Sequence, residues 1–387
     1  MTGNNYSPSS YPRRILLAVS GLTPQVVTET IHALATNKTD PFVPTEIHIL
    51  STVEGANRAK LTLLSDKPGW FHQLCREYKL NGIAFPEENV HVLCDHEGQP
   101  LEDIRTEREN ESAADCITEK IRELTLDSAC ALHVSMAGGR KTMGFFAGYA
   151  LSLFGRPQDR LSHVLVPSDY ESASDFFYPS PVRRVIEGHG QKPLDSAEAR
   201  LMLASIPFVS LRHGLPQQLL EGQGSYSAVV AAAALALGPA KLVVDLAGHR
   251  ISAAGRVIHM NPNALALLSV FARRAKASKP ALAAPPKPLE NKVAPDMVWA
   301  KRFKTELRQM YAHYEDIPQT TRDALHKGMD GDYFSMQLSR LHRDLRRSLG
   351  GAADSYLIDN GGTRPCRYEL KLIPEAISFE DLPEPTL

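Results

Sequence analysis

The fold is decided near the N-terminus by Arg14-Ile-Leu-Leu-Ala-Val-Ser20, a nearly continuous apolar run that ends at Gly21-Leu22-Thr23-Pro24. Such a run is typical of a strand buried on both faces, as in a parallel sheet. A helical pattern follows, with its apolar residues spaced along one side over residues 26–34. Thr23 before Pro24 predicts an N-cap followed by proline at the first helical position. The stretch is therefore predicted to form a strand–loop–helix unit.

The same pattern recurs further along the chain. Four more strands are expected, at 46–52, 90–94, 130–135 and 161–166. The expected helices between them are 54–64, 110–124 and 143–154. Strands that alternate with helices predict a doubly wound α/β domain with a mostly parallel sheet, over residues 12–195. Residues 1–11 are polar and are predicted to be a disordered tail.

The second half of the chain has a different pattern of predicted strands and helices. Residues 196–240 are predicted to be a helical connector, and 241–387 a second, α+β domain. Its predicted strands are 242–246, 249–259, 356–359 and 366–372, and its predicted helices are 263–276, 299–314, 319–327 and 333–349. The stretch 279–295 is rich in Ala, Pro and Lys and is predicted to be a loop or linker.

Composition excludes several classes of protein. The chain has 387 residues, enough for two or three domains at about 150 residues each, and its net charge is −1. Any contact with nucleic acid must therefore be a local patch. We find no apolar run long enough to span a bilayer and no signal peptide. Five scattered cysteines without a C-x-x-C pair indicate a reducing cytoplasm rather than a disulfide framework or a zinc site.

Two loops after predicted strands contain residues that are candidates for binding a ligand. The first is Val19–Gln25 and the second is Ser135–Thr142. In an open parallel sheet, ligands bind outside the carboxyl ends of the strands. The second loop combines two glycines, two adjacent cations and a hydroxyl at a helix N-terminus, a set that favours an anion such as a phosphodiester. It is not a Walker A loop, because Arg140 stands where that motif needs glycine. The plainer alternative is a capping turn with two solvated basic residues.

These loops resemble those of the CARF (CRISPR-associated Rossmann fold) ring nucleases of type III CRISPR systems. The matching motifs are Leu22-Thr23-Pro24 and Gly138-Gly139-Arg140-Lys141-Thr142-Met143. The second motif is specific, whereas the first is weak by itself. The resemblance covers about the first 190 residues and implies a Rossmann-like domain.

The resemblance implies a homodimer that binds cyclic tetra-adenylate across its two-fold axis and cleaves it without a metal or other cofactor. Lys141 corresponds to the family's catalytic lysine and Thr23 to a catalytic serine, with Ser20 as a neighbouring hydroxyl. The Ser-to-Thr departure at Thr23 puts the cleavage rate in doubt more than binding. The implied ligand-binding residues are Gly21, Leu22, Gln25, Ser135, Met136, Ala137, Gly138, Gly139, Arg140 and Thr142.

A second constellation lies near the C-terminus. The predicted helix 333–349 is strongly basic, and a predicted hairpin with a turn at Asn360-Gly361-Gly362 follows it. This order resembles a winged helix-turn-helix of the response-regulator type, in which the basic helix enters the major groove of double-stranded DNA. The candidate DNA contacts are Ser339, Arg340, Arg343, Arg347 and Arg364. The alternatives are a solvated helix face, a module for dimerisation or partner docking, and an unrelated fold.

Three functions stay open at this point. The first is a ring nuclease that limits a CRISPR antiviral alarm. The second is a cyclic oligoadenylate sensor that does not cut and that regulates transcription through DNA. The third is a nucleotide-binding α/β protein outside CRISPR. The acidic and aromatic segment 169–180 is either a lid whose Phe176, Phe177 or Tyr178 stacks on adenine, or a plain surface loop.

Overall fold

The computed structural model describes residues 7–381, except Ala137, Pro216, Gln223, 288–293 and 363–365. The chain divides into two compact units. Unit 1 is built from the residues up to Arg212 together with Leu220–Ala228, and unit 2 from His213–Leu219 with the residues from Val229 onward. Helices α7 (Gln217–Glu221) and α8 (Tyr226–Leu237) are each shared between the two units.

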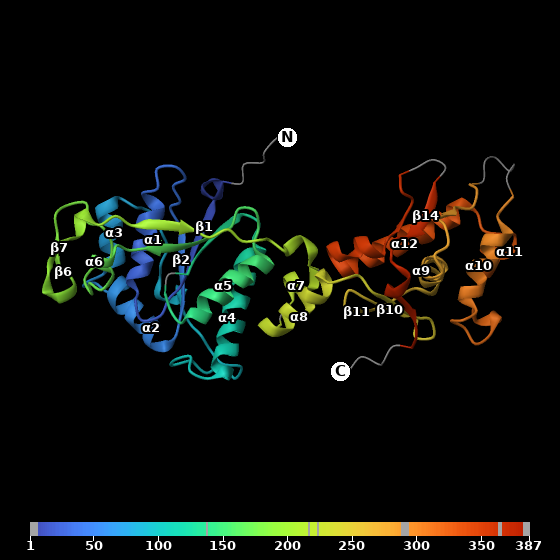
Figure 1. Cartoon of the computed structure of the whole chain (residues 1–387), viewed down its shortest axis with the longest axis horizontal. Coiled ribbons are helices and arrows are strands. Elements are labelled where there is room, and N and C mark those ends of the chain that lie inside the picture. Colours follow the sequence, from blue (N-terminus) through green and yellow to red (C-terminus); the bar gives the residue numbers. More distant parts are fainter. Residues whose placement is uncertain are drawn as a thin grey trace. The chain divides into compact units, whose positions relative to one another are not determined.

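Unit 1 contains a six-stranded sheet in the order β3-β2-β1-β4-β5-β8 (Figure 1). The first five of these strands are parallel, and β8 closes the edge as an antiparallel strand. The strands are β1 (Arg13–Val19), β2 (Glu46–Ser51), β3 (Val90–Val92), β4 (Cys130–Ser135), β5 (Arg160–Leu165) and β8 (Met202–Ser205). A separate hairpin joins β6 (Val185–Glu187) and β7 (Pro193–Asp195).

Helices cover both faces of this sheet. They are α1 (Gln25–Ala35), α2 (Val53–Ala59), α3 (Trp70–Tyr78), α4 (Glu107–Leu126), α5 (Lys141–Phe154) and the short α6 (Ser168–Glu171). Leu16 and Ala18 of β1 pack in one core cluster with α1, α2 and α3. Alternate residues of a strand point to opposite faces, and Figure 1 shows α4 and α5 on the other side of the sheet. The protein is therefore mixed α/β with a mostly parallel main sheet, as its sequence predicts.

The local predictions for unit 1 had mixed outcomes. Helix α1 begins at Gln25, Pro24 takes the N-cap position, and no side chain caps the helix, so Thr23 does not act as the N-cap. The predicted helix 54–64 is confirmed as a helical segment, which consists of α2 followed by a π-helical turn, Lys60–Leu64. The prediction did not include β8, because a four-residue edge strand gives little periodic signal.

The aromatic segment after β5 is part of the core. Phe176, Phe177 and Tyr178 are 1%, 5% and 2% exposed. The ring of Phe177 stacks on Trp70 of α3 at 4.7 Å between centroids. These rings are therefore not free to stack on a bound base, so the lid interpretation was wrong. The surface-loop interpretation was wrong for residues 176–180, which are buried, whereas residues 169–175 are mostly exposed.

Unit 2 contains two small sheets. One has the order β11-β10-β9-β15, and the other β12-β14-β13. The strands are β9 (Leu242–Asp245), β10 (Arg250–Ala253), β11 (Arg256–His259), β12 (Leu282–Ala283), β13 (Ile358–Asp359), β14 (Arg367–Leu370) and β15 (Ile377–Phe379). The helices are α9 (Pro262–Lys276), α10 (Met297–Leu307), α11 (Gln319–His326) and α12 (Gly331–Leu349).

The core of unit 2 surrounds α9, whose residues from Ala264 to Ala272 are all buried. Part of the predicted linker belongs to this structure: Leu282 and Ala283 pair with β14, and the Ala283 carbonyl accepts a hydrogen bond from Trp299 Nε1 at 2.9 Å. The loop interpretation was wrong there, because a strand of two residues leaves no pattern in an Ala/Pro-rich stretch.

Within the described ranges, none of the helices combines the length and the apolar character that crossing a bilayer requires.

Candidate functional site

The two glycine-containing loops lie side by side at the middle of the main sheet. Strands β1 and β4 are neighbours, in register from Arg13↔Cys130 to Ala18↔Ser135, and the strand order reverses between them. A β-carbon on Gly21 would lie 2.8 Å from the Cα of Gly139, so the two backbones touch where they leave the sheet. Gly139 also has φ +83°, a backbone conformation that favours glycine. The crevice at such a reversal is where open α/β sheets bind ligands.

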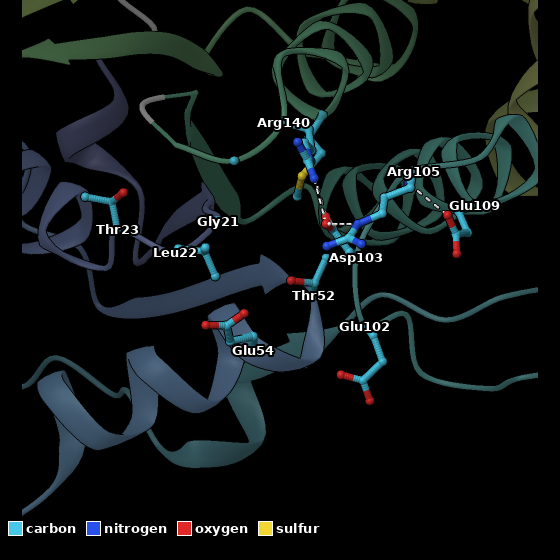
Figure 2. A pocket seen from close by; sticks show the side chains of 12 residues that line it. Gly21, Leu22, Thr23, Thr52, Glu54, Glu102, Asp103, Arg105, Glu109 and Arg140 are labelled. Carbon is cyan, nitrogen blue, oxygen red and sulfur yellow. Dashed lines mark hydrogen bonds and ion pairs between the residues drawn. The ribbon is translucent and has the colours of Figure 1, made fainter.

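A cavity of about 640 Å³ opens beside these loops. Its volume lies within the range of about 300–1,000 Å³ of small-molecule sites. Four segments meet around it: the loop after β1, the start of α2, the stretch before α4 and the loop after β4 (Figure 2). The lining residues are Gly21, Leu22, Thr23, Thr52, Glu54, Glu102, Asp103, Arg105, Glu109, Gly139, Arg140 and Met143.

One carboxylate in this cavity holds two arginines. Arg140 donates two hydrogen bonds to Asp103, from Nη2 to Oδ2 at 2.6 Å and from Nε to Oδ1 at 3.2 Å. Arg105 Nε donates to the same Oδ2 at 2.8 Å. Figure 2 shows both guanidinium groups pointing at this carboxylate. Their donated hydrogen bonds hold the pKa of Asp103 well below its usual range.

The segment that carries Asp103 is anchored at both ends. On one side, the carbonyl of the buried Leu101 accepts a hydrogen bond from the Val53 backbone N–H at 2.9 Å. On the other, Glu109 Oε2 accepts from the backbone N–H groups of Arg105 and Thr106, each at 2.8 Å. The Thr106 hydroxyl accepts from Glu109 N in return, which completes a capping box at the start of α4. The position of the carboxylate is therefore built into the fold.

A second, smaller cavity of about 390 Å³ lies next to the first. Arg105 and Arg140 line both cavities, while Lys141 and Thr142 line only the smaller one. Lys141 is exposed and is the first residue of α5. The N-terminus of a helix is electropositive, which adds to the local attraction for an anion.

The structure brings together some of the predicted ligand residues. Gly21, Leu22, Thr23, Gly139 and Arg140 line the larger cavity, and Lys141 and Thr142 the smaller one. The predicted catalytic pair Thr23 and Lys141 is thus divided between two cavities, with Arg140 common to both.

Other predicted residues lie behind the loops and line neither cavity. Ser20 is 1% exposed, and its Oγ donates to the Thr23 carbonyl at 3.4 Å. Ser135 is equally buried, 3.1 Å from the Thr30 hydroxyl, and Gln25 Nε2 donates to the Ser174 carbonyl at 3.1 Å. Gly138 and Met136 belong to the loop after β4 and also line neither cavity, and Ala137 lies outside the described residues.

Sequence reasoning missed the acidic side of the cavity. Glu102 and Asp103, with the neighbouring Arg105, come from a stretch without strand or helix periodicity, and Glu109 lies in the first turn of α4. One signal was available: Thr106-Glu-Arg-Glu109 is a capping-box sequence, which places a helix start and a fixed loop there. Among the residues that the structure describes, no three His, Cys, Asp or Glu side chains are grouped to hold a metal ion.

In unit 2, helix α12 presents the predicted basic face to solvent. Asp330 caps the helix, and Phe334, Leu341, Leu345 and Leu349 are buried on its inner side. Ser339, Arg340, Arg343 and Arg347 are all exposed. The antiparallel pair β13–β14 follows, extended by β12 into a three-stranded sheet. Arg364, the remaining candidate DNA contact, lies outside the described residues.

A model of the family described as CRISPR-associated protein NE0113 (Cas_NE0113) matches residues 23–236, more than half of the chain. The chain belongs to this family. Membership of Cas_NE0113 indicates a role in CRISPR systems, and the matched segment contains the lining residues of the two neighbouring cavities except Gly21 and Leu22. No curated protein matches this Cas_NE0113 chain.

Proposed function

We propose that unit 1 binds a cyclic oligoadenylate, with cyclic tetra-adenylate as the expected ring, and cleaves it within a CRISPR signalling system. The observation that carries this proposal is the cavity at the reversal of strand order, where Gly21 and Gly139 bring two loops together beside Arg140. Membership of Cas_NE0113 supports the CRISPR setting. The choice of an adenylate ring rests on the resemblance of residues 22–24 and 138–143 to the CARF loops.

Binding of a phosphodiester fits the groups that this site offers. Arg140 and Arg105 present planar guanidinium forks, which suit the two oxygens of a phosphate. Lys141 and the N-terminus of α5 add positive charge beside them. A ring of four nucleotides exceeds one small cavity, so we propose that a second copy of the chain supplies the other half of the site in a homodimer.

Cleavage needs little beyond alignment and charge. In the proposed reaction, a ribose 2′-oxygen forms a bond to the adjacent phosphorus and the bond from phosphorus to the 5′-oxygen breaks. The proton of the 2′-hydroxyl passes to the departing 5′-oxygen by way of water, and the products are linear with 2′,3′-cyclic phosphate ends. Lys141 would neutralise the charge that develops on the phosphorane, and Thr23 would orient the ribose.

The test is a cleavage assay on the full chain with labelled cyclic tetra-adenylate and a chelator. We expect linear products from the wild type and at least a hundredfold slower cleavage from Lys141→Ala, since a transition-state charge contact is removed. Lys38→Ala is the matched control, because Lys38 is an exposed lysine in the loop after α1. Tight binding of an intact ring would favour the non-cleaving sensor, and absence of binding would refute both versions.

A second candidate function belongs to unit 2. We propose that α12 and the β13–β14 hairpin form a winged helix-turn-helix that binds double-stranded DNA. The supporting observation is the row of exposed side chains Arg340, Arg343 and Arg347 on a helix whose other side is core. Helix α9, strand β12, helices α10 to α12 and the hairpin follow one another in the order of that fold.

This candidate is tested by binding of the full chain to promoter DNA from its own gene neighbourhood, measured over a series of salt concentrations. Arginine contacts to phosphate make such binding strongly dependent on salt. Equal, weak retention of wild type and Arg343→Ala at low salt would remove the DNA function and leave docking of a partner as the role of this face.

A further inference from the structure

The Arg140–Asp103–Arg105 cluster lies between two neighbouring cavities of unit 1. Both arginines line the cavity of about 640 Å³ and also the cavity of about 390 Å³. Asp103 joins them, with three hydrogen bonds of 2.6, 2.8 and 3.2 Å. Figure 2 shows the cluster at the edge of the larger cavity. The strongest anion-binding groups of the site are thus already engaged by the protein's own carboxylate.

The Asp103 carboxylate contacts Arg140 in the geometry that a bound anion would adopt. Arg140 meets Asp103 through Nε and Nη2, the paired arrangement in which a guanidinium binds a carboxylate or a phosphate. A ligand phosphate that uses the same donors must take them from Asp103. Three further carboxylates of the larger cavity, Glu54, Glu102 and Glu109, make the surroundings less favourable for a polyanion.

The two partners differ in their freedom to move. Asp103 lies between Leu101 and Ile104, which are 6% and 8% exposed, and its Oδ1 accepts from the Ile104 backbone N–H at 2.7 Å. The side chain of Arg140 is 53% exposed and that of Arg105 is 78% exposed. The carboxylate is therefore fixed, and the arginines are the groups that can turn away from it.

We propose that Asp103 is an internal competitor of the ligand, which holds Arg140 and Arg105 until a phosphate of the ligand displaces it. The identity of that ligand as a cyclic oligoadenylate rests on the proposed function, whereas competition for the arginines applies to any polyphosphate that enters the cavity. Release of Arg140 joins the two cavities and brings Thr23 and Lys141 to one continuous site. Asp103 thus sets the ligand concentration at which the site fills.

The test compares Asp103→Asn with Glu102→Gln, each titrated by calorimetry with tripolyphosphate and with cyclic tetra-adenylate. Both variants remove one negative charge from the same cavity, but only the first frees the arginines. We expect Asp103→Asn to bind tripolyphosphate about tenfold more tightly than Glu102→Gln does, as charge-assisted hydrogen bonds no longer have to be broken. Thermal unfolding of both variants establishes that each remains as stably folded as the wild type.

The two probes separate the two proposals. If Asp103→Asn binds tripolyphosphate no more tightly than Glu102→Gln does, the competitor role is overturned. Weaker binding by Asp103→Asn would show in addition that Asp103 positions Arg140 for the ligand. Tighter tripolyphosphate binding without ring binding by any variant would support the competitor role and refute the proposed function. A variant Asp103→Ala that repeats the gain would exclude a special effect of the asparagine amide.

Discussion

Glu29 offers a sharp test of the core of unit 1, because it is a carboxyl group on a buried face of α1. The residue is 5% exposed. Burial raises the pKa of its carboxyl from the ordinary 4.5 to about 8, and the negative charge of Glu171 adds to the shift. The folded protein therefore keeps a proton that the unfolded chain releases at lower pH. The stability that this proton confers is complete below about pH 4.5 and is lost as the pH rises through about 8.

The size of the effect follows from the two pKa values. One pKa unit corresponds to about 1.36 kcal/mol. For a carboxyl with a pKa of about 8 when folded and 4.5 when unfolded, linkage gives a loss of about 3 kcal/mol between pH 5.5 and pH 8. Relaxation around a buried charge lowers that figure, so we expect about 1–3 kcal/mol. Glu29→Gln removes the titrating group and with it this part of the pH dependence.

The assay is urea unfolding of both proteins at several pH values between 5.5 and 8. A Trp299→Phe background leaves Trp70, which stacks on Phe177 in the core of unit 1, as the fluorescent reporter of that unit. Glu88→Gln, at an exposed glutamate, serves as the control and is expected to follow the wild type. Parallel pH profiles for wild type and Glu29→Gln would refute the assignment of a buried, protonated carboxyl.

Three further outcomes are expected. Gly21→Ala places a methyl group 2.8 Å from the Cα of Gly139, so we expect a loss of about 1–3 kcal/mol in unfolding free energy and weaker ring binding, measured by urea unfolding and calorimetry. Lys141→Arg keeps the charge but not the compact ammonium, and we expect ring affinity within threefold of wild type with slower cleavage; unchanged cleavage would contradict a specific role for the lysine. Arg343→Ala is expected to lower DNA affinity and to reduce the slope of affinity against salt by about one, and Lys301→Ala, at an exposed position of α10, to leave that slope unchanged.

Much of unit 1 was predictable from its sequence because its central strands are buried on both faces. The run at 14–20 is buried from Ile15 to Ser20, and strands β2 and β4 are buried over nearly their whole length in the same way. Each of these strands therefore has a near-continuous apolar sequence that can be recognised. The predicted helices at 26–34, 110–124 and 143–154 all exist, with ends that differ by a few residues. Short edge elements such as β8 gave too few residues for a period to appear.

The candidate site was only half predictable. Glycines and cations after a strand have a recognisable pattern, and Gly21, Gly139 and Arg140 do meet at one cavity. Asp103 reaches that cavity through a tertiary contact with Arg140, 37 residues away, and no local period encodes it. The same reason applies to Phe177, whose stacking partner Trp70 lies far away in the sequence on helix α3, so a segment expected outside the core forms part of it.

The last described strand, β15, has a consequence for how the protein folds during its synthesis on the ribosome. β15 pairs in parallel with β9, so the four-stranded sheet of unit 2 lacks one of its strands until residues 377–379 have been synthesised. The six-stranded sheet of unit 1 has all its strands once Ser205 emerges. Domains fold in the order in which they leave the ribosome. The nascent chain therefore has a long interval in which the sheet beside the cavity of Gly21, Gly139 and Arg140 has all its strands, while helix α12 still lacks the complete sheet of unit 2.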